Sequence, residues 1–261
     1  MNAVILAAGR GSRLGTLTVD RPKTLLSIKG KTLLSRILSS LLNHGITEIT
    51  LVLGFQPEKI IAEVKENFPQ INIRFVFNTE YQKRENIYSL FLALPFVQEG
   101  DLLILNADLF FEDGILKKLL QEPENAIVVD HSSVFTEEAT KVKLNEEGFV
   151  ADIGKELLPI ESDGESIGML KLTQCSAILY GEQVTAMVER GDTQVWYPYA
   201  LKKILPQLCL KPVPTGTFLW EEIDTIPDYE RAIQKAEGKS IKQKLLSRQQ
   251  WIFNPTSPVI K

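Results

Sequence analysis

Cysteine and histidine are scarce in this sequence, with two of each among 261 residues. The cysteines, Cys175 and Cys209, form no CxxC pair, which argues against a cysteine-based metal cluster and favours free thiols in a reducing cytoplasm. The histidines, His44 and His131, have no neighbours that would mark either as a catalytic base. The chemistry of this chain is therefore expected to depend on other residue types.

Long apolar runs and an excess of positive charge are also missing. No segment approaches the roughly 18–20 apolar residues that a membrane span requires. The apolar start at Asn2–Ala8 precedes its basic residues, whereas a signal peptide carries its positive charge first. A formal net charge of −4 gives no basic footprint for nucleic acid. We therefore expect a cytoplasmic protein that binds neither a membrane nor nucleic acid.

Short apolar runs alternate with amphipathic stretches up to about residue 130. The runs predict strands at Ala3–Ala7, Ile49–Leu53, Ile73–Phe77, Asp101–Leu105 and Ala126–Val129. The amphipathic stretches predict helices at Lys31–Asn43, Pro57–Phe68 and Gly114–Gln121. This alternation predicts an α/β fold, a Rossmann-like three-layer sandwich around a mostly parallel mixed sheet.

The pattern changes in the second half of the chain, where a hairpin is expected between Lys141–Leu144 and Phe149–Ile153. Further strands are predicted at Met169–Leu172, Ser176–Tyr180 and Trp220–Asp224, and further helices at Gln194–Leu205 and Asp228–Ala236. No linker rich in glycine, serine or proline interrupts the chain. The sequence therefore predicts one domain over 1–238, built from halves 1–130 and 131–238, and then a C-terminal helix and irregular arm over 239–261.

A glycine-rich turn follows the first predicted strand. Gly9 and Gly11 let the backbone approach a ligand closely and present N–H donors to it. Arg10 and Arg13 add positive charge where a polyphosphate would lie, and Lys23 follows a short distance along the chain. This combination favours a nucleotide phosphate site.

Three other interpretations of the glycine motifs compete with this one. A dinucleotide-binding fingerprint could begin at Gly9, but Leu14 stands where its third small residue belongs, and no acidic residue ends a second strand about 20 residues later. Gly30-Lys-Thr32 resembles the end of a Walker A motif, but Leu25 replaces its first glycine. A purely structural turn remains open, although it would leave the neighbouring basic residues unexplained.

The segment Leu6–Leu14, followed by Arg21-Pro-Lys23, resembles the signature of the sugar-nucleotide pyrophosphorylase and nucleotidyltransferase superfamily. The segment Asn78–Leu90 is similar to the base-recognition segment of small CTP-dependent cytidylyltransferases, which act on phosphocholine, aminoethylphosphonate or inositol 1-phosphate. Leu105–Asp108 and Trp220–Thr225 resemble the metal-binding segments of the superfamily. The resemblance covers roughly residues 1–237 and implies the nucleotide-diphospho-sugar transferase fold.

This resemblance implies the transfer of a nucleoside monophosphate, CMP from CTP in the first place, to a small phosphorylated or phosphonate substrate with release of pyrophosphate. The half 1–130 would bind the NTP, and the half 131–238 the acceptor. A sugar-1-phosphate nucleotidyltransferase that uses UTP, GTP or dTTP is the main alternative, and a catalytically silent nucleotide sensor is a more remote one. Either a monomer or a homodimer is compatible with the sequence.

The resemblance also implies a role for individual residues. Arg13 and Lys23 would be catalytic, and Asp108 and Asp224 would hold Mg²⁺, which takes one or two carboxylates and keeps several waters. The nucleotide would contact Leu6, Ala7, Ala8, Gly9, Gly11, Ser12, Asn78, Asn86, Ser89 and Ala107. The acceptor would contact Lys141, Lys155, Trp196 and Glu222.

Several of these residues have a structural alternative. Asparagines such as Asn78 and Asn86 also cap loops, Lys141 and Lys155 can be solvated lysines of a hairpin, and a tryptophan such as Trp196 often packs in a core. The stretch Trp196-Tyr-Pro-Tyr199 is aromatic where the superfamily often carries acidic residues. Such rings would suit a quaternary ammonium group, and the identity of the acceptor stays open.

Overall fold

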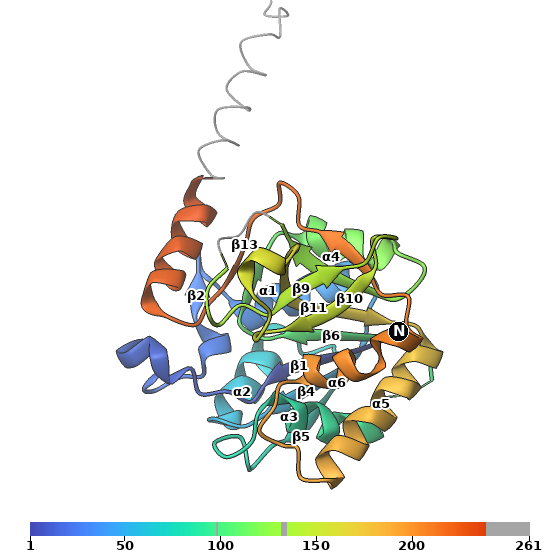
Figure 1. The fold of residues 1–261 in the computed structure, drawn as a ribbon. Coiled ribbons are helices and arrows are strands. Elements are labelled where there is room, and N and C mark those ends of the chain that lie inside the picture. The colour runs from blue at the N-terminus through green and yellow to red at the C-terminus, as the bar shows by residue number, and fades with distance from the viewer. Residues whose placement is uncertain (98, 132–134, 239–261) are drawn as a thin grey trace, which may run out of the picture.

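The computed structural model describes residues 1–97, 99–131 and 135–238. Within these residues, nine strands form a central sheet, and helices cover both of its faces (Figure 1). Seven strands follow the order β10-β9-β11-β6-β1-β4-β5, while β8 pairs with β11 and β12 pairs with β8. The predicted α/β class and three-layer arrangement are confirmed.

The sheet is mixed but mostly parallel on its N-terminal side. Its strands are β1 (Asn2–Ala7), β4 (Glu48–Leu53), β5 (Ile73–Phe77), β6 (Leu102–Asn106), β8 (Ala126–Asp130), β9 (Lys141–Leu144), β10 (Val150–Gly154), β11 (Gly164–Leu172) and β12 (Lys211–Pro214). Strand β1 is parallel to β4 and β6, and β4 is parallel to β5. Strand β11 runs antiparallel to β6, β8 and β9. The carboxyl ends of β1 and β6 therefore meet at one edge of the sheet.

Two apolar clusters, one on each face, hold the helices to the sheet. One face carries α1 (Leu33–Asn43), α2 (Pro57–Asn67) and α4 (Asp113–Gln121). The other carries α3 (Asn86–Ala93), α5 (Gln174–Glu189) and α6 (Tyr197–Ile204). Alternate residues of β1 point into opposite clusters, Ala3 and Ile5 into the first and Val4 into the second. This double burial explains why the strand is apolar throughout.

Short helices and strand pairs bring the glycine-rich turn next to the last part of the described chain. They are the 3-10 helices η1 (Ser12–Thr18) and η2 (Lys23–Leu25), the pair β2 (Ser27–Ile28) and β3 (Lys31–Thr32), and the antiparallel pair β7 (Leu109–Phe111) and β13 (Trp220–Glu222). A last helix occupies 226–238. A third apolar cluster, which includes Leu14, Phe110 and Ile223, packs these pieces together.

The strand predicted at Ser176–Tyr180 is wrong, because these residues lie in α5. A short apolar run cannot by itself distinguish a strand from a buried helix. Buried Ala177, Tyr180, Val184 and Val188 recur at helical spacing along α5, and the Tyr180 hydroxyl donates a hydrogen bond of 2.7 Å to the Tyr197 carbonyl. The helix is thus fixed by its packing on α6.

Other predicted elements differ mainly at their ends. The helix expected from residue 31 begins at Leu33, because residues 31–32 form β3 and the Thr32 hydroxyl accepts the Ser35 N–H at 3.0 Å as an N-cap. The helix α3 was not predicted. The predicted tail at 239–261 lies outside the described residues. In the described part of the chain, no helix combines the length and the apolar character needed to cross a membrane.

Candidate active site

A cavity of about 340 Å³ opens at the carboxyl ends of β1 and β6, the edge of an α/β sheet where ligands commonly bind. Most of the residues predicted to form the site line this cavity. They are Leu6, Ala7, Ala8, Gly9, Gly11, Ser12, Arg13, Lys23, Asn78, Asn86, Ser89, Ala107, Asp108, Lys155, Trp196, Glu222 and Asp224. Segments from the whole length of the described chain therefore contribute to this one cavity.

The glycine-rich turn is packed directly against the stem of Lys23. Gly11 adopts a left-handed conformation with φ of 72°, and a Cβ atom at this position would lie 2.8 Å from the Cβ of Lys23. The Thr18 hydroxyl donates to the Gly11 carbonyl at 2.8 Å, and Leu14 is fully buried beneath the turn. Glycine is thus required at position 11 both by its conformation and by this close approach.

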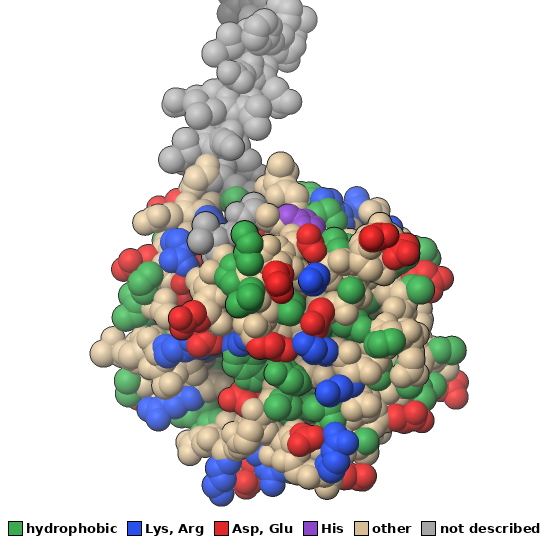
Figure 2. All heavy atoms as spheres, viewed as in Figure 1, with side chains coloured by type: hydrophobic (Ala, Val, Ile, Leu, Met, Phe, Trp, Pro, Cys, Tyr) green, Lys and Arg blue, Asp and Glu red, His purple; other side chains and the backbone are tan. Residues whose placement is uncertain are grey.

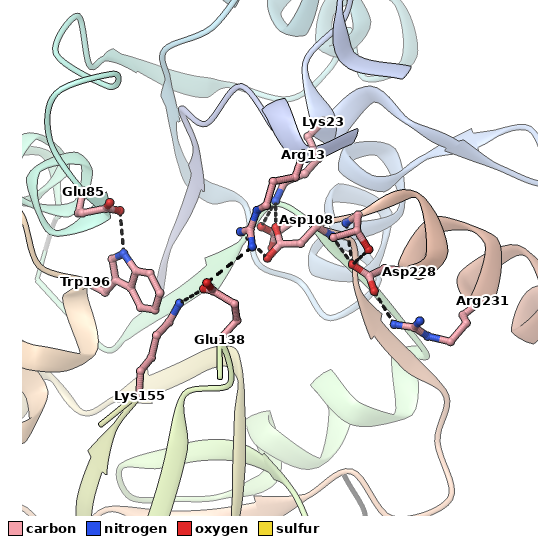
Figure 3. Close-up of polar contacts among 11 residues, drawn as sticks. Arg13, Lys23, Glu85, Asp108, Glu138, Lys155, Trp196, Asp228 and Arg231 are labelled. Carbon is pink, nitrogen blue, oxygen red and sulfur yellow. Dashed lines mark hydrogen bonds and ion pairs between the residues drawn. The ribbon is translucent and has the colours of Figure 1, made fainter. Parts of the chain in front are cut away.

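Lys23 lines the cavity and lies between the carboxylates of Asp108 and Asp224. Figure 3 shows Lys23 next to Asp108. Its Nζ atom is 2.7 Å from Oδ2 of Asp108 and 2.6 Å from Oδ1 of Asp224. Burial disfavours the charged form of Lys23, but the two neighbouring carboxylates more than offset this and raise its pKa above the ordinary value. The ammonium group is therefore charged at neutral pH and bridges the two acids.

The pair β7 and β13 brings Asp108 and Asp224 together. Asp108 immediately precedes β7, and Asp224 follows β13 by two residues. The Ile223 N–H donates to the Asp108 carbonyl at 3.1 Å, while the Asp228 carboxylate accepts the N–H groups of Asp224 and Thr225. The backbone on both sides of Asp224 is therefore fixed by hydrogen bonds.

The two carboxylates fit a hard cation such as Mg²⁺. Oδ1 of Asp108 is buried and has no hydrogen-bond partner among the described residues, so it keeps acceptor capacity. The described residues hold no group of three or more His, Cys, Asp or Glu side chains arranged for a metal ion. A cation here would take Asp108 and Asp224 and complete its shell with water and phosphate oxygens, the usual pattern for Mg²⁺.

A line of ion pairs continues from Asp224 across the cavity. Arg13 contacts Asp224 at 3.1 Å and approaches Glu138 at 3.9 Å. Glu138 accepts a hydrogen bond of 2.6 Å from Lys155, and the ammonium of Lys155 lies over the ring of Trp196 (Figure 3). Glu138 was not predicted as a site residue, because nothing in its local sequence distinguishes it from other surface glutamates.

The charges in this line shift the pKa values of its members. The hydrogen bond from Lys155 lowers the pKa of Glu138 below its ordinary value. Burial lowers the pKa of Lys155, although Glu138 counteracts the effect. The Glu222 carboxylate faces the same cavity, where desolvation together with the charges of Asp108 and Asp224 raises its pKa above the ordinary value, although the residue as a whole is exposed.

The asparagines predicted to read a base make hydrogen bonds within the protein. Asn78 is buried, donates to the Ser89 hydroxyl at 2.9 Å and accepts the Glu80 N–H at 2.9 Å. Asn86 accepts the Tyr197 N–H at 2.9 Å. These contacts match the capping alternative, so both asparagines stabilise the wall of the cavity between β5, α3 and α6.

Lys141 is the predicted site residue that does not line the cavity. Its side chain is 2% exposed, and its ammonium donates to the Ala139 carbonyl at 3.2 Å. Lys155, in contrast, reaches the cavity from the loop after β10. Of the two lysines predicted to contact the acceptor, Lys155 lines the cavity and Lys141 does not.

Asn106 and Gly168 also line the cavity, although neither was named as a site residue from the sequence. Gly168 has a φ of 83°, and a Cβ atom there would lie 2.4 Å from the Asn106 amide nitrogen. The close contact between Asn106 and Gly168 joins β6 and β11, so an isolated glycine or asparagine gives no sign of it in the sequence.

The chain matches a family profile described as the MobA-like NTP transferase domain over residues 3–215. It is 31% identical over 215 residues to the CTP:phosphoglutamine cytidylyltransferase of Campylobacter jejuni, covering 76% of this chain and 81% of that protein. It is also 29% identical over 243 residues to the bifunctional IPC transferase and DIPP synthase of Aquifex aeolicus. That match covers 92% of this chain but 53% of the relative, so the chain spans about half of its length.

A solved structure has the same fold as this chain. The inositol-1-phosphate CTP transferase from T. maritima superposes with a TM-score of 0.74 at 24% identity, covering 90% of this chain and 95% of that structure. At this identity the similarity establishes the fold alone.

Proposed function

Because this chain belongs to the MobA-like NTP transferase domain family, we propose that it transfers CMP from CTP to a small phosphorylated or phosphonate acceptor and releases pyrophosphate, with Mg²⁺ as the cofactor. The family assignment and the cytidylyltransferase relatives make the chain a nucleotidyltransferase. The choice of CTP, the metal, the acceptor class and the release of pyrophosphate are proposed.

The arrangement of Lys23 between Asp108 and Asp224 is the observation that carries the proposal. Transfer of a nucleotidyl group requires little covalent chemistry from the protein, since alignment and neutralisation of charge supply most of the catalysis. A buried ammonium next to two cation-binding carboxylates supplies positive charge at a fixed point. This point lies beside the glycine-rich turn, where a triphosphate would be held.

In the proposed reaction, an oxygen of the acceptor's phosphate or phosphonate attacks the α-phosphorus of CTP. The bond from the α-phosphorus to the bridging oxygen breaks, and pyrophosphate leaves with that electron pair. The backbone of Gly9–Ser12 and the guanidinium of Arg13 would hold the β- and γ-phosphates. Lys23 would stabilise the negative charge that develops around the α-phosphate. A bound Mg²⁺ on Asp108 and Asp224 would neutralise phosphate charge.

Two observations support CTP over other nucleotides. One relative described above is named CTP:phosphoglutamine cytidylyltransferase, and Asn78, Asn86 and Ser89 line the cavity. Because the two asparagines already bond within the protein, we expect backbone groups of this wall to share the recognition of the base.

The test is pyrophosphate release with Mg²⁺, in a grid that combines four NTPs with phosphocholine, aminoethylphosphonate, inositol 1-phosphate and glucose 1-phosphate. Turnover with CTP and one of the first three acceptors is expected. It should fall at least about 100-fold in Lys23→Met, since one transition-state donor is worth about 10²–10³ in kcat. The control Lys31→Met removes an exposed lysine and should leave turnover unchanged.

Other outcomes would revise the proposal in defined ways. Turnover only with glucose 1-phosphate and another NTP would identify a sugar-1-phosphate nucleotidyltransferase. Binding of nucleotides without turnover in any combination would favour a nucleotide sensor and contradict the proposed reaction.

A further inference from the structure

Glu138 occupies a position between the two cations on which both substrates of the proposed reaction would depend. One carboxylate oxygen accepts the Lys155 ammonium at 2.6 Å, and the other lies 3.9 Å from the Arg13 guanidinium. Arg13 belongs to the glycine-rich turn, and Lys155 to the acceptor half of the cavity. Figure 3 shows the Glu138 carboxylate directed toward both side chains.

The side chain of Glu138 is accessible, whereas its partner Lys155 is held by its surroundings. The Glu138 side chain is 59% exposed, and that of Lys155 is 26% exposed and packed over the Trp196 ring. The indole N–H of Trp196 in turn donates to Glu85 at 2.7 Å, which fixes the ring. A carboxylate so exposed can turn out to solvent, while the ammonium stays in the cavity.

The carboxylate also has the chemistry of the group that it would replace. A phosphate or phosphonate oxygen, like a carboxylate oxygen, accepts charge-assisted hydrogen bonds from ammonium and guanidinium groups. The hydrogen bond from Lys155 keeps the pKa of Glu138 low, so Glu138 is an anion at neutral pH. The free enzyme thus already contains an anion bound to its own acceptor-side cation.

We propose that Glu138 is a displaceable internal counter-ion that occupies the place of the acceptor's phosphate or phosphonate at Lys155, and so sets the affinity for the acceptor. This inference rests on the proposed function. Each acceptor molecule must displace the carboxylate before its own anion can reach Lys155. Glu138 is therefore a residue that weakens binding of the acceptor in the native enzyme.

A different interpretation of the contact between Glu138 and Lys155 predicts the opposite effect on acceptor binding when Glu138 is lost. Glu138 and Trp196 would in that case form a site for an ammonium group of the acceptor, and the Lys155 ammonium would occupy that site in the free enzyme. Loss of Glu138 would then weaken the binding of amino-bearing acceptors only. Two probes separate these cases, since 2-aminoethylphosphonate carries the amine and ethylphosphonate does not. We favour the counter-ion because Arg13 also approaches the Glu138 carboxylate.

The experiment is calorimetric titration of both phosphonates into the full-length wild type, Glu138→Gln and Glu137→Gln. We expect Glu138→Gln to bind both probes about 2- to 5-fold more tightly, the range for loss of a competing, partly exposed ion pair. Glu137 is the exposed neighbour of Glu138, and Glu137→Gln, which removes the same charge nearby, should leave both affinities unchanged. In a Lys155→Met background the gain from Glu138→Gln should disappear.

Unchanged or weaker binding of both probes to Glu138→Gln would overturn the counter-ion proposal. Weaker binding of 2-aminoethylphosphonate alone would replace it with the ammonium site. An equal gain in Glu137→Gln would also refute it, because general charge would then explain the effect. CTP-dependent turnover that Lys23→Met abolishes would preserve the proposed function in each of these cases, whereas no turnover with any acceptor would remove the proposed function itself.

Discussion

Replacing Lys23 with methionine would remove the positive charge that separates two carboxylates while keeping a side chain of similar length. Oδ2 of Asp108 and Oδ1 of Asp224 each lie within 2.7 Å of the ammonium nitrogen, so they are at most about 5.3 Å apart. At an effective dielectric constant of about 20, two unit charges at that distance repel by roughly 3 kcal/mol. Removal of one partner from a buried ion pair costs about 3–5 kcal/mol in other proteins.

We therefore expect Lys23→Met to lose about 2–4 kcal/mol of stability without divalent cations. The lower bound reflects the partial exposure of the two carboxylates, at 18% and 26%. For a chain of this size, 1 kcal/mol corresponds to roughly 2–3 °C in Tm. The variant should thus melt roughly 5–10 °C below the wild type in EDTA at pH 7.5.

Thermal unfolding with increasing Mg²⁺ completes this assay. Mg²⁺ should raise the Tm of Lys23→Met more than that of the wild type, because no ammonium then competes for Asp108 and Asp224, while Lys31→Met should behave as the wild type does. A variant that melts within 1 °C of the wild type in EDTA would refute the role of Lys23 as the counter-charge. Equal gains from Mg²⁺ in both proteins would refute the assignment of the carboxylates as its ligands.

Two further predictions concern pH and backbone strain. Despite its burial, Asp224 has a lowered pKa because of Lys23, so its contribution to stability is present above the unfolded pKa of about 3.9 and is lost as pH falls through the folded pKa. In urea titrations, the difference in unfolding free energy between the wild type and Lys23→Met should therefore narrow below about pH 4. A difference that stays constant with pH would contradict this coupling. Gly148 and Gly168 both have a φ of 83°, but only a Cβ at Gly168 meets a neighbour, the Asn106 amide at 2.4 Å. Gly148→Ala should cost about 1–2 kcal/mol from strain alone, whereas Gly168→Ala should cost more and also reduce turnover; equal losses of stability would show that the contact is unimportant.

The parallel part of the fold and most residues of the cavity could be predicted because their signals are local. Strand β1 is apolar on both faces, and the glycine-rich turn follows it directly in the sequence. Whether these residues have the assigned catalytic and binding roles stays a prediction. The helix at Ser176–Tyr180 was missed because four consecutive apolar residues fit a strand as well as a helix.

Contacts across space explain the remaining differences. The alternation of Lys141-Val-Lys-Leu144 suggests one solvated face, yet Lys141, which pairs with Glu165 of β11, is buried, whereas Lys143 is exposed. Glu138 acquires its significance from Arg13 and Lys155, which lie far from it in the sequence or on another loop. No local pattern encodes such partners.

The order in which the cavity is completed follows from the β7 and β13 pair. Lys23 meets its second carboxylate across 201 positions of the sequence, and that carboxylate lies just after β13, which pairs with β7. During synthesis from the N-terminus, the glycine-rich turn and Asp108 are therefore made long before Asp224 emerges. Contacts between such distant segments also form slowly in folding. A chain that ends before β13 would lack Asp224, one of the two carboxylates beside Lys23, so the last part of the described domain completes the proposed site.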